Sequence, residues 1–285
     1  MVEQGLDATY LSGWIGRGET VEDVIHPGPA QLLAATLDIR DANLESGAAL
    51  PPLWHWIYFL TAAPASDLGR DGHPKLGDFL PPVALPRRMW AGGRLEMNKP
   101  LRIGDVARRQ SSVTDVTLKN GRSGALCFVV VRHEFYVGDE LRLAEEHDIV
   151  YRQEADPDQP TPALPLAPTD ADWSQEINPD PVTLFRYSAL TFNGHRIHYD
   201  RRFCLEDEGY EGLVVHGPLT ATWLLGLVQD QLPDASIRHF SFRAVSPVFD
   251  TGPVTIAGKR KDGSVDLWAA TASGHLAMQA TADLA

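Results

Sequence analysis

The sequence predicts an α+β fold in which a strongly apolar helix and an antiparallel sheet each occur twice. Two observations support this: both halves of the chain end in two β-prone runs joined by a glycine turn, and each half has an apolar helix candidate upstream. The 285 residues are about twice a typical domain. Apolar residues make up 44% and charged residues 22%, which are the proportions of an ordinary globular chain.

The glycine turns predict one β-hairpin in each half. Asn120-Gly121 lies in the turn Lys119–Arg122, and Asp262-Gly263 lies in the turn Lys261–Ser264. These dipeptides favour two-residue hairpin turns, because both central residues of a type I′ turn need a positive φ. The flanking strands are expected at 111–118 and 126–132 in the first half, and at 254–259 and 265–272 in the second.

Three helices are expected. The first covers 27–37, where Pro27 fits a helix start and apolar residues follow. The second begins at Asp180-Pro181 and is broken by Asn193-Gly194. The third covers 217–228 and has almost no polar face, so it must be enclosed by other parts of the protein.

A proline-rich segment divides the chain. Residues 155–171 contain five prolines among Asp, Thr and Gln, a composition that favours an extended connector. We therefore assign residues 1–154 to an N-terminal domain, 155–171 to a linker and 172–285 to a C-terminal domain. The two sheets are expected to be able to pair edge to edge.

Charge and composition narrow the choice of partners. The net charge of −13 disfavours binding to nucleic acid. Cys127 and Cys204 form neither a disulfide framework nor a zinc site, which favours the reducing cytoplasm. The N-terminus lacks the features of a secretory signal, and no apolar run approaches the roughly 20 residues that span a bilayer. We expect no contact with a membrane.

The densest polar group of the sequence lies at 188–200. His195, Arg196, His198 and Asp200 follow the break at Asn193-Gly194, so they are expected on a turn where side chains can converge on a cleft. A histidine in such a place is often only a structural residue. The start of the enclosed helix adds a second feature, because the unpaired N–H groups there, including that of Gly217, favour a developing negative oxygen. A base together with an oxyanion donor indicates catalysis.

At these residues the C-terminal half resembles the MaoC-like, or hydratase-2, hot-dog acyl-thioester dehydratases. Asn193 and His198 have the spacing of that family's catalytic Asp and His, Asp200 matches an acidic residue that often follows, and His216-Gly217 falls at the expected distance. Further strings resemble the double hot-dog branch of mesaconyl-C4-CoA (3-methylfumaryl-CoA) hydratases and mitochondrial-type dehydratases: 52–59, 71–75, 79–83, 86–92 and 193–198. The resemblance implies two hot-dog units, each a sheet wrapped around a helix.

One position departs from the family pattern. Asn193 stands where the broader family has its catalytic aspartate, and an amide cannot take up a proton. We therefore expect His198 to act alone as the acid/base residue, with an ordinary pKa near 6.5 that suits this task. Asn193 would position the water, and the Gly217 N–H would bind the thioester oxygen as negative charge develops on it.

A CoA ester with a free carboxylate requires cations. Arg87, Arg88 and Arg196 are candidates, although solvent exposure is the alternative for each. Trp90 is a candidate for stacking on the CoA moiety, with a place in the core as its alternative. The resemblance adds His216 to the substrate-binding residues.

The predicted function is that of a hydro-lyase that adds water reversibly to an enoyl-CoA, with 3-methylfumaryl-CoA giving citramalyl-CoA. The alternatives are a dehydratase of general 3-hydroxyacyl-CoA or acyl-carrier-protein thioesters, a non-catalytic acyl-thioester binder and a thioesterase. No dinucleotide, P-loop or nucleophile-elbow motif is present, so no cofactor is expected. The other seven histidines are scattered without metal-ligand spacing, so no metal is expected either. A homodimer is a further expectation.

Overall fold

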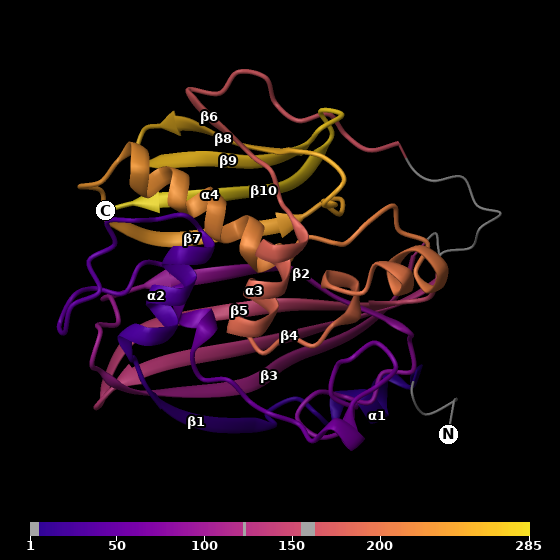
Figure 1. The fold of residues 1–285 in the computed structure, drawn as a ribbon. Coiled ribbons are helices and arrows are strands. Elements are labelled where there is room, and N and C mark those ends of the chain that lie inside the picture. The colour runs from indigo at the N-terminus through magenta and orange to yellow at the C-terminus, as the bar shows by residue number, and fades with distance from the viewer. Residues whose placement is uncertain (1–5, 122–123, 155–162) are drawn as a thin grey trace.

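One antiparallel sheet organises the protein. The structure is a computed structural model that describes residues 6–121, 124–154 and 163–285. Ten strands follow the order β1-β3-β4-β5-β2-β7-β10-β9-β8-β6 across the sheet (Figure 1). Their bounds are β1 Gly18–Val24, β2 Arg87–Met97, β3 Val106–Gly121, β4 Gly124–Val137, β5 Glu140–Arg152, β6 Trp173–Ile177, β7 Ile237–Ala244, β8 Val254–Lys261, β9 Ser264–Thr271 and β10 Leu276–Leu284.

The first five strands come from the N-terminal half, the last five from the C-terminal half, and β2 pairs with β7 where they meet. Glycine is required at this junction, because a Cβ on Gly92 would lie 2.6 Å from the carbonyl oxygen of Phe242. The predicted α+β class with two antiparallel sheets is therefore confirmed. Edge-to-edge pairing makes the two sheets continuous.

The helices lie mainly on one face of this sheet (Figure 1). Their bounds are α1 Ala8–Ser12, α2 Pro27–Thr36, α3 Pro181–Leu190 and α4 Gly217–Gln231, with short helical turns η2 Trp54–Ile57, η3 Ala65–Asp67, η4 Arg196–His198 and η5 Phe203–Asp207. None of the helices in the described ranges is long and apolar enough to cross a membrane.

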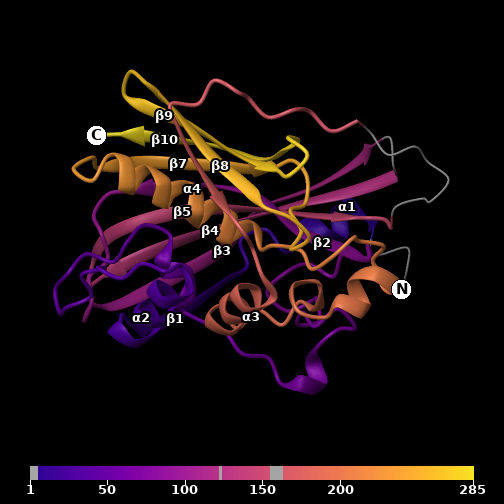
Figure 2. The same cartoon turned by 45° about the horizontal axis from the view of Figure 1, so that its top comes forward.

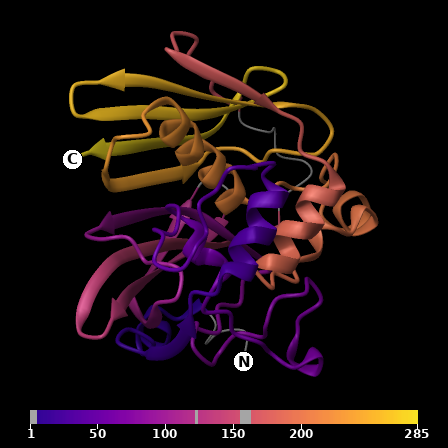
Figure 3. The ribbon, with the colours of Figure 1, turned by 60° about the vertical axis from the view of Figure 1, so that its left-hand side comes forward.

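The two long helices predicted from apolar residues differ in their burial. Helix α4 crosses the C-terminal strands, and Leu219, Leu224 and Val228 are fully buried, as expected for an enclosed helix (Figure 2). Helix α2 buries only one face and leaves Leu32 exposed. It runs beside α3 instead of being wrapped by strands (Figure 3). The N-terminal half is thus a more open version of the same unit.

The two predicted hairpins have different outcomes. In the C-terminal half, Asp262-Gly263 connects β8 and β9 as predicted. Gly263 has a positive φ of 73° but Asp262 does not, so the predicted type I′ geometry, which needs a positive φ at both residues, is wrong. In the N-terminal half the predicted turn position is wrong, because Asn120 and Gly121 belong to β3 and pair with β4. The ladder continues to the Gly121–Gly124 pair, and the hairpin tip at 122–123 lies outside the described residues.

The predicted linker is described only from residue 163 onward, since 155–162 lie outside the described residues. Beyond that point the chain contacts the C-terminal sheet: Leu166 pairs with His275, and Asp170 forms an ion pair with Lys259. This part of the segment is therefore tied to the C-terminal half. The domain boundaries at 154 and 172 remain predictions.

A loop of the N-terminal half packs closely against the turn that follows α3. A Cβ on Gly72, which has a φ of +88°, would lie 2.0 Å from the carbonyl oxygen of Gly194. The backbone N–H of Arg196 donates to the carbonyl of Asp71 at 2.9 Å. Because two glycines allow the backbones to touch, the residues beside them are brought together from distant parts of the chain.

This contact predicts that Gly72→Ala is far more damaging than a glycine substitution at a similar φ elsewhere. Gly16→Ala is the matched control, because Gly16 has a φ of +86° but open space where a Cβ would be. Both variants strain the backbone, whereas only Gly72→Ala also overpacks the contact, adding about 1–3 kcal/mol of destabilisation. Urea unfolding of the two variants measures the difference. Equal destabilisation would contradict the close contact.

Candidate active site

A cavity of about 440 Å³ opens between the two halves of the chain. This volume is within the usual range for small-molecule sites. The N-terminal half contributes the loop at 71–73 and strand β2, and the C-terminal half contributes the turn after α3 and the start of α4. The polar residues of its lining include Asp71, His73, Arg87, Arg88, His147, Arg152, Asn193, His195, His198, Glu208, His216 and Thr220.

His198 lies in η4 with its ring in this cavity and only 7% exposed. Its Nδ1 lies 2.7 Å from the carbonyl oxygen of Val214, so Nδ1 carries a proton and donates it there. The Nε2 atom has no hydrogen-bond partner among the described residues. The ring is therefore fixed by the backbone with a free lone pair on Nε2, the form that a general base requires.

The environment of His198 keeps the imidazole neutral. Burial lowers its pKa to about 4, and the charge of His73 acts in the same direction, whereas the hydrogen bond with Val214 opposes the shift. The pKa is therefore well below the value near 6.5 expected from the sequence. At neutral pH the residue is fully in its basic form, and its protonated form is a stronger acid than ordinary imidazolium.

His216 supports His198 from behind and begins the enclosed helix. The two rings stack with centroids 3.6 Å apart, and Nε2 of His216 shares a hydrogen bond of 2.8 Å with the hydroxyl of Ser188. Burial lowers the pKa of His216 well below its usual value. The role of His216 in substrate binding stays a prediction.

Gly217 follows as the first residue of α4 and also lines the cavity. Its N–H has no acceptor among the described residues, and a Cβ there would meet protein atoms only at 3.8 Å or more. The protein itself does not require glycine at this position. The N–H is at the start of a helix that borders the cavity, a position where a backbone donor can bind a ligand oxygen.

Asn193 also lines the cavity, and its orientation is fixed. The side-chain Oδ1 accepts a hydrogen bond of 3.0 Å from the backbone N–H of His195. Since the backbone N–H can only donate, the amide nitrogen of Asn193 must point the other way. This side chain is therefore a hydrogen-bond donor for a water or a substrate oxygen.

Arg196 is not part of the cavity lining, whereas His195 and His198 on the same turn are. Its guanidinium forms an ion pair with Asp200 at 2.8 Å, and it lies 4.2 Å from the ring centroid of Phe203. It also donates to the carbonyl of Arg70 at 3.1 Å. These contacts hold the turn together and leave no geometry that favours substrate binding by Arg196.

Arg87 and Arg88 are adjacent in β2 but have different surroundings. Arg87 donates to the carbonyl of Glu208 at 2.9 Å, and its Nε lies 3.4 Å from the carboxylate of the same residue. Arg88 lines the same cavity and has no carboxylate within ion-pair distance among the described residues. Arg88 is thus a cation that an anionic ligand can pair with, as is Arg152, which lines the same cavity and also has no ion pair among the described residues.

Trp90 forms part of an aromatic wall. Its ring lies 3.9 Å from that of His147 and packs edge-on against Trp56 and Phe242. Its indole N–H donates to the carbonyl of Gly92 at 2.7 Å, within the same strand. The side chain is therefore held in place and presents a surface to the cavity, which leaves its predicted role in CoA stacking open.

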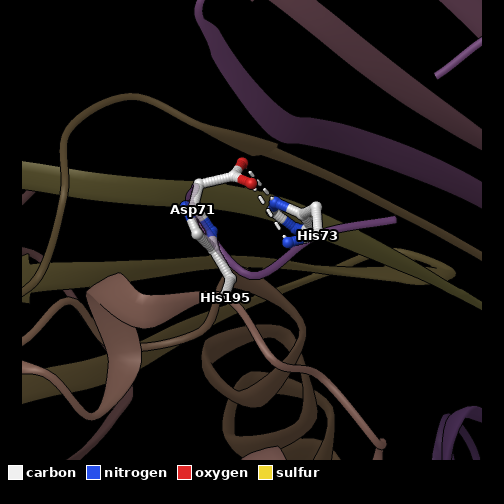
Figure 4. A group of neighbouring side chains, drawn as sticks. All are labelled: Asp71, His73 and His195. Carbon is white, nitrogen blue, oxygen red and sulfur yellow. Dashed lines mark hydrogen bonds and ion pairs between the residues drawn. The ribbon is translucent and has the colours of Figure 1, made fainter. Parts of the chain in front are cut away.

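Sequence reasoning missed a group on the N-terminal side of the cavity: Asp71, His73 and His195. Nδ1 of His73 lies 2.8 Å from the Asp71 carboxylate, whose other oxygen accepts the backbone N–H of His73 at 3.0 Å (Figure 4). The ring of His195 is 4.1 Å from that of His73. In the sequence His73 is one of the scattered histidines, and the signal that could have singled it out is its place in the string 71–75, which carries part of the family resemblance.

Within the described residues, two groups have donor atoms close enough together for a metal ion. They are Asp71, His73 and His195, and, deeper in the N-terminal half, His133, Glu145 and His147. Sequence spacing did not reveal either group. Glu145 is buried; burial alone would raise its pKa, but His147 and His55 hold it well below its usual value, so it remains a carboxylate. It accepts hydrogen bonds of 3.1 Å from His55 and 2.9 Å from Trp56, which assigns it a structural role.

Comparisons with known proteins agree with this architecture. Residues 53–250 match the family model of hydroxyacyl-thioester dehydratase type 2. The chain is 46% identical to a mesaconyl-C(4)-CoA hydratase of Chloroflexus aurantiacus, over 95% of this chain and 96% of the relative. A MaoC-like dehydratase of Phytophthora capsici matches at a TM-score of 0.69 and 14% identity, covering 98% of this chain and 99% of that structure.

A further structural neighbour bears on the fold alone. A Mycobacterium tuberculosis protein described as a double hotdog fold matches at a TM-score of 0.57 and 12% identity, over 95% of this chain and 96% of its own. The continuous sheet, the enclosed helix and the histidine-lined cavity define a double hot-dog protein of the hydratase and dehydratase class. Within that class, the chain belongs to the hydroxyacyl-thioester dehydratase type 2 family.

Proposed function

We propose that this protein adds water reversibly to the carbon–carbon double bond of an enoyl-CoA, with mesaconyl-C4-CoA (3-methylfumaryl-CoA) as substrate and citramalyl-CoA as product. The observation that carries the proposal is the fixed ring of His198, with its free Nε2 in a cavity that also contains the N-terminus of α4. The relative at 46% identity, which is named a mesaconyl-C(4)-CoA hydratase, supports the choice of substrate.

The geometry supports a division of roles for the hydration step. Nε2 of His198 takes a proton from water, and the amide nitrogen of Asn193 holds that water as its oxygen attacks C3. The N–H of Gly217 donates to the thioester oxygen, where negative charge gathers as C3 is attacked. C2 then receives a proton, which completes the addition of water.

Arg88 favours an acyl group that carries a free carboxylate over a plain acyl chain as the substrate. This half-buried guanidinium has no carboxylate partner in the described part of the chain, so it gains most from a ligand that brings a carboxylate, because such a pair forms two parallel hydrogen bonds. Asp71, His73 and His195 line the same cavity and make it polar. A dehydratase of general 3-hydroxyacyl thioesters is the alternative, and the family description supports it.

We further propose a cytoplasmic location, which the two free, buried cysteines favour.

The acid/base role of His198 predicts the effect of His198→Ala. We expect kcat for hydration of mesaconyl-C4-CoA to fall by about 100-fold or more, because the group that takes the water proton is missing. Loss of the enoyl-thioester absorbance measures hydration, and release of free thiol is followed in parallel. His239→Ala, at an exposed histidine of β7, is the control and should retain activity.

Three outcomes would contradict the proposal. Near-normal turnover by His198→Ala would remove that residue from its role. Release of thiol by the wild-type protein at the rate of absorbance loss would indicate a thioesterase. Binding of enoyl-CoA esters without any turnover would indicate an acyl-thioester binder.

The carboxylate-binding role of Arg88 predicts the effect of Arg88→Gln. We expect kcat/KM for mesaconyl-C4-CoA to fall by about 10- to 100-fold, the size of one lost charge-assisted contact, and that for crotonyl-CoA to change by less than about threefold. The comparison of the two substrates is the measurement. Arg87→Gln is the matched control, and it should affect both substrates alike because Arg87 is paired with Glu208. Equal losses for both substrates with Arg88→Gln would contradict a carboxylate-binding role.

A further inference from the structure

We propose that His73, paired with Asp71, is the second proton-transfer residue of this site and exchanges the proton at C2 while His198 exchanges the proton of water. This inference rests on the proposed hydratase function and names the group that completes the reaction. The N-terminal half thereby supplies, from a loop far away in the sequence, an acid/base residue in the place of the carboxylate absent at Asn193.

The need for a second group follows from the chemistry of hydration. Water loses one proton as its oxygen adds to C3, and C2 gains one proton. Asn193 cannot exchange a proton, and its Oδ1 is already occupied by the backbone N–H of His195. His198 begins the reaction as a neutral base, so the proton for C2 is best supplied by another residue.

His73 and Asp71 have the geometry of an acid/base pair. The Nδ1 of His73 and the Asp71 carboxylate are 2.8 Å apart, so the imidazole donates through Nδ1 and presents Nε2 on its opposite side. Both residues line the cavity that contains His198. A carboxylate in this position stabilises the imidazolium form, as in triads that contain histidine and aspartate. Figure 4 shows Asp71 and His73 facing each other, with the His195 ring close by.

The surrounding charges make this pair responsive to the substrate. Burial and the positive charge of Arg88 on β2 lower the pKa of His73, whereas the hydrogen bond and charge of Asp71 raise it. His195 and His198, on the turn after α3, are the other titratable groups that face it. A substrate carboxylate bound to Arg88 cancels the effect of that arginine. Burial still lowers the pKa of His73 in that complex, and the hydrogen bond and charge of Asp71 are what favour its protonated form there.

The reaction balances with these two residues. In hydration, Nε2 of His198 takes a proton from water, the water oxygen bonds to C3, the π electrons move toward C2, and protonated His73 gives its Nε2 proton to C2. His198 is left as imidazolium and His73 as neutral imidazole. The ring of His195 is close to both, with its centroid 4.1 Å from that of His73 and 5.5 Å from that of His198, and it offers a path for returning the proton.

The same three donors could hold a metal ion, but two observations favour the acid/base pair. Asp71 and His73 are already hydrogen-bonded to each other, and a cation would have to displace that proton. The positive charge of Arg88 also acts on both His73 and His195 and disfavours a second cation. Metal binding by these three residues is therefore the competing outcome in the experiment below.

The test uses the full-length protein with mesaconyl-C4-CoA and the variants Asp71→Asn, His73→Asn and the double variant. We expect His73→Asn to lower kcat by about 100-fold or more with little change in KM, and the double variant to be no worse, since the two residues act as a unit. Asp78→Asn is the matched control, because Asp78 is an exposed carboxylate on the same loop, and it should keep full activity.

The pH profile separates an acid from a residue that only supports the loop. His73 must be protonated for hydration, and Asp71 raises its pKa, so Asp71→Asn should move the alkaline limb of the kcat profile to lower pH. The loss of activity should then be much larger at pH 8 than at pH 6. A merely structural role predicts the same fractional loss at both pH values.

Failure of the His73 role and failure of the proposed hydratase function give different results. If the wild-type protein hydrates the substrate and His198→Ala does not, but Asp71→Asn and His73→Asn stay within about threefold of wild type, this inference fails while the hydratase assignment stands. An unchanged alkaline limb in Asp71→Asn also overturns it. Loss of activity after chelation, restored by Zn²⁺ or Mn²⁺, would assign the cluster to a metal instead. If the wild-type protein hydrates no enoyl-CoA, the proposed function itself fails.

Discussion

The backbone contact between Gly72 and Gly194 is the constraint on which the site depends. It brings a loop of the N-terminal half against the turn after α3, so that Asp71 and His73 share a cavity with His195 and His198. Any side chain at Gly72 would overlap the opposing carbonyl oxygen. The continuous sheet formed by β2 and β7 fixes the two halves relative to each other, and the loop contact then closes the cavity.

Burial sets the chemistry of this cavity. His73, His195, His198 and His216 all have pKa values lowered first of all by desolvation. Desolvation favours the neutral imidazole, which provides bases without leaving unpaired charge in the interior, and Asp71 opposes this effect at His73. The hydrogen bond from His198 to Val214 and the pair formed by His73 and Asp71 then decide which nitrogen of each ring faces the ligand. Ligand charge can change this balance at His73 and His195, because the charge of Arg88 acts on those two rings.

The fold was predictable where the signal is local. The apolar residues of 217–228 required an enclosed helix, and the structure has one at α4. Asp262-Gly263 marked its hairpin turn correctly, and Gly263 provides the positive φ there. Asn120-Gly121 carried the same local signal, yet these residues extend a strand, since pairing with β4 continues past them. Local turn preference was overridden by the longer ladder of the sheet.

The site was predictable only on the C-terminal side, where the spacing of Asn193, His198 and Gly217 could be compared with a known pattern. The contribution of Asp71 and His73 could not be predicted, because their loop reaches the cavity only through contacts between distant parts of the chain. One of these is the hydrogen bond from the Arg196 guanidinium to the carbonyl of Arg70, 126 positions away. The sequence also could not show that Arg87 forms an ion pair and Arg88 does not, because the partner of Arg87 is Glu208, far away in the chain. Arg196 is held by Asp200 and Phe203, and only the folded turn reveals this.

The central claim is that His198 is a neutral base with its proton on Nδ1 and its Nε2 free. NMR of ¹⁵N-histidine-labelled protein tests this most directly, with the His198 signals assigned by their loss in His198→Gln. The account predicts a neutral ring with the proton on Nδ1 at pH 7, and protonation only as the pH approaches a pKa of about 4. A proton on Nε2, or titration near the ordinary value of 6.5, would contradict it.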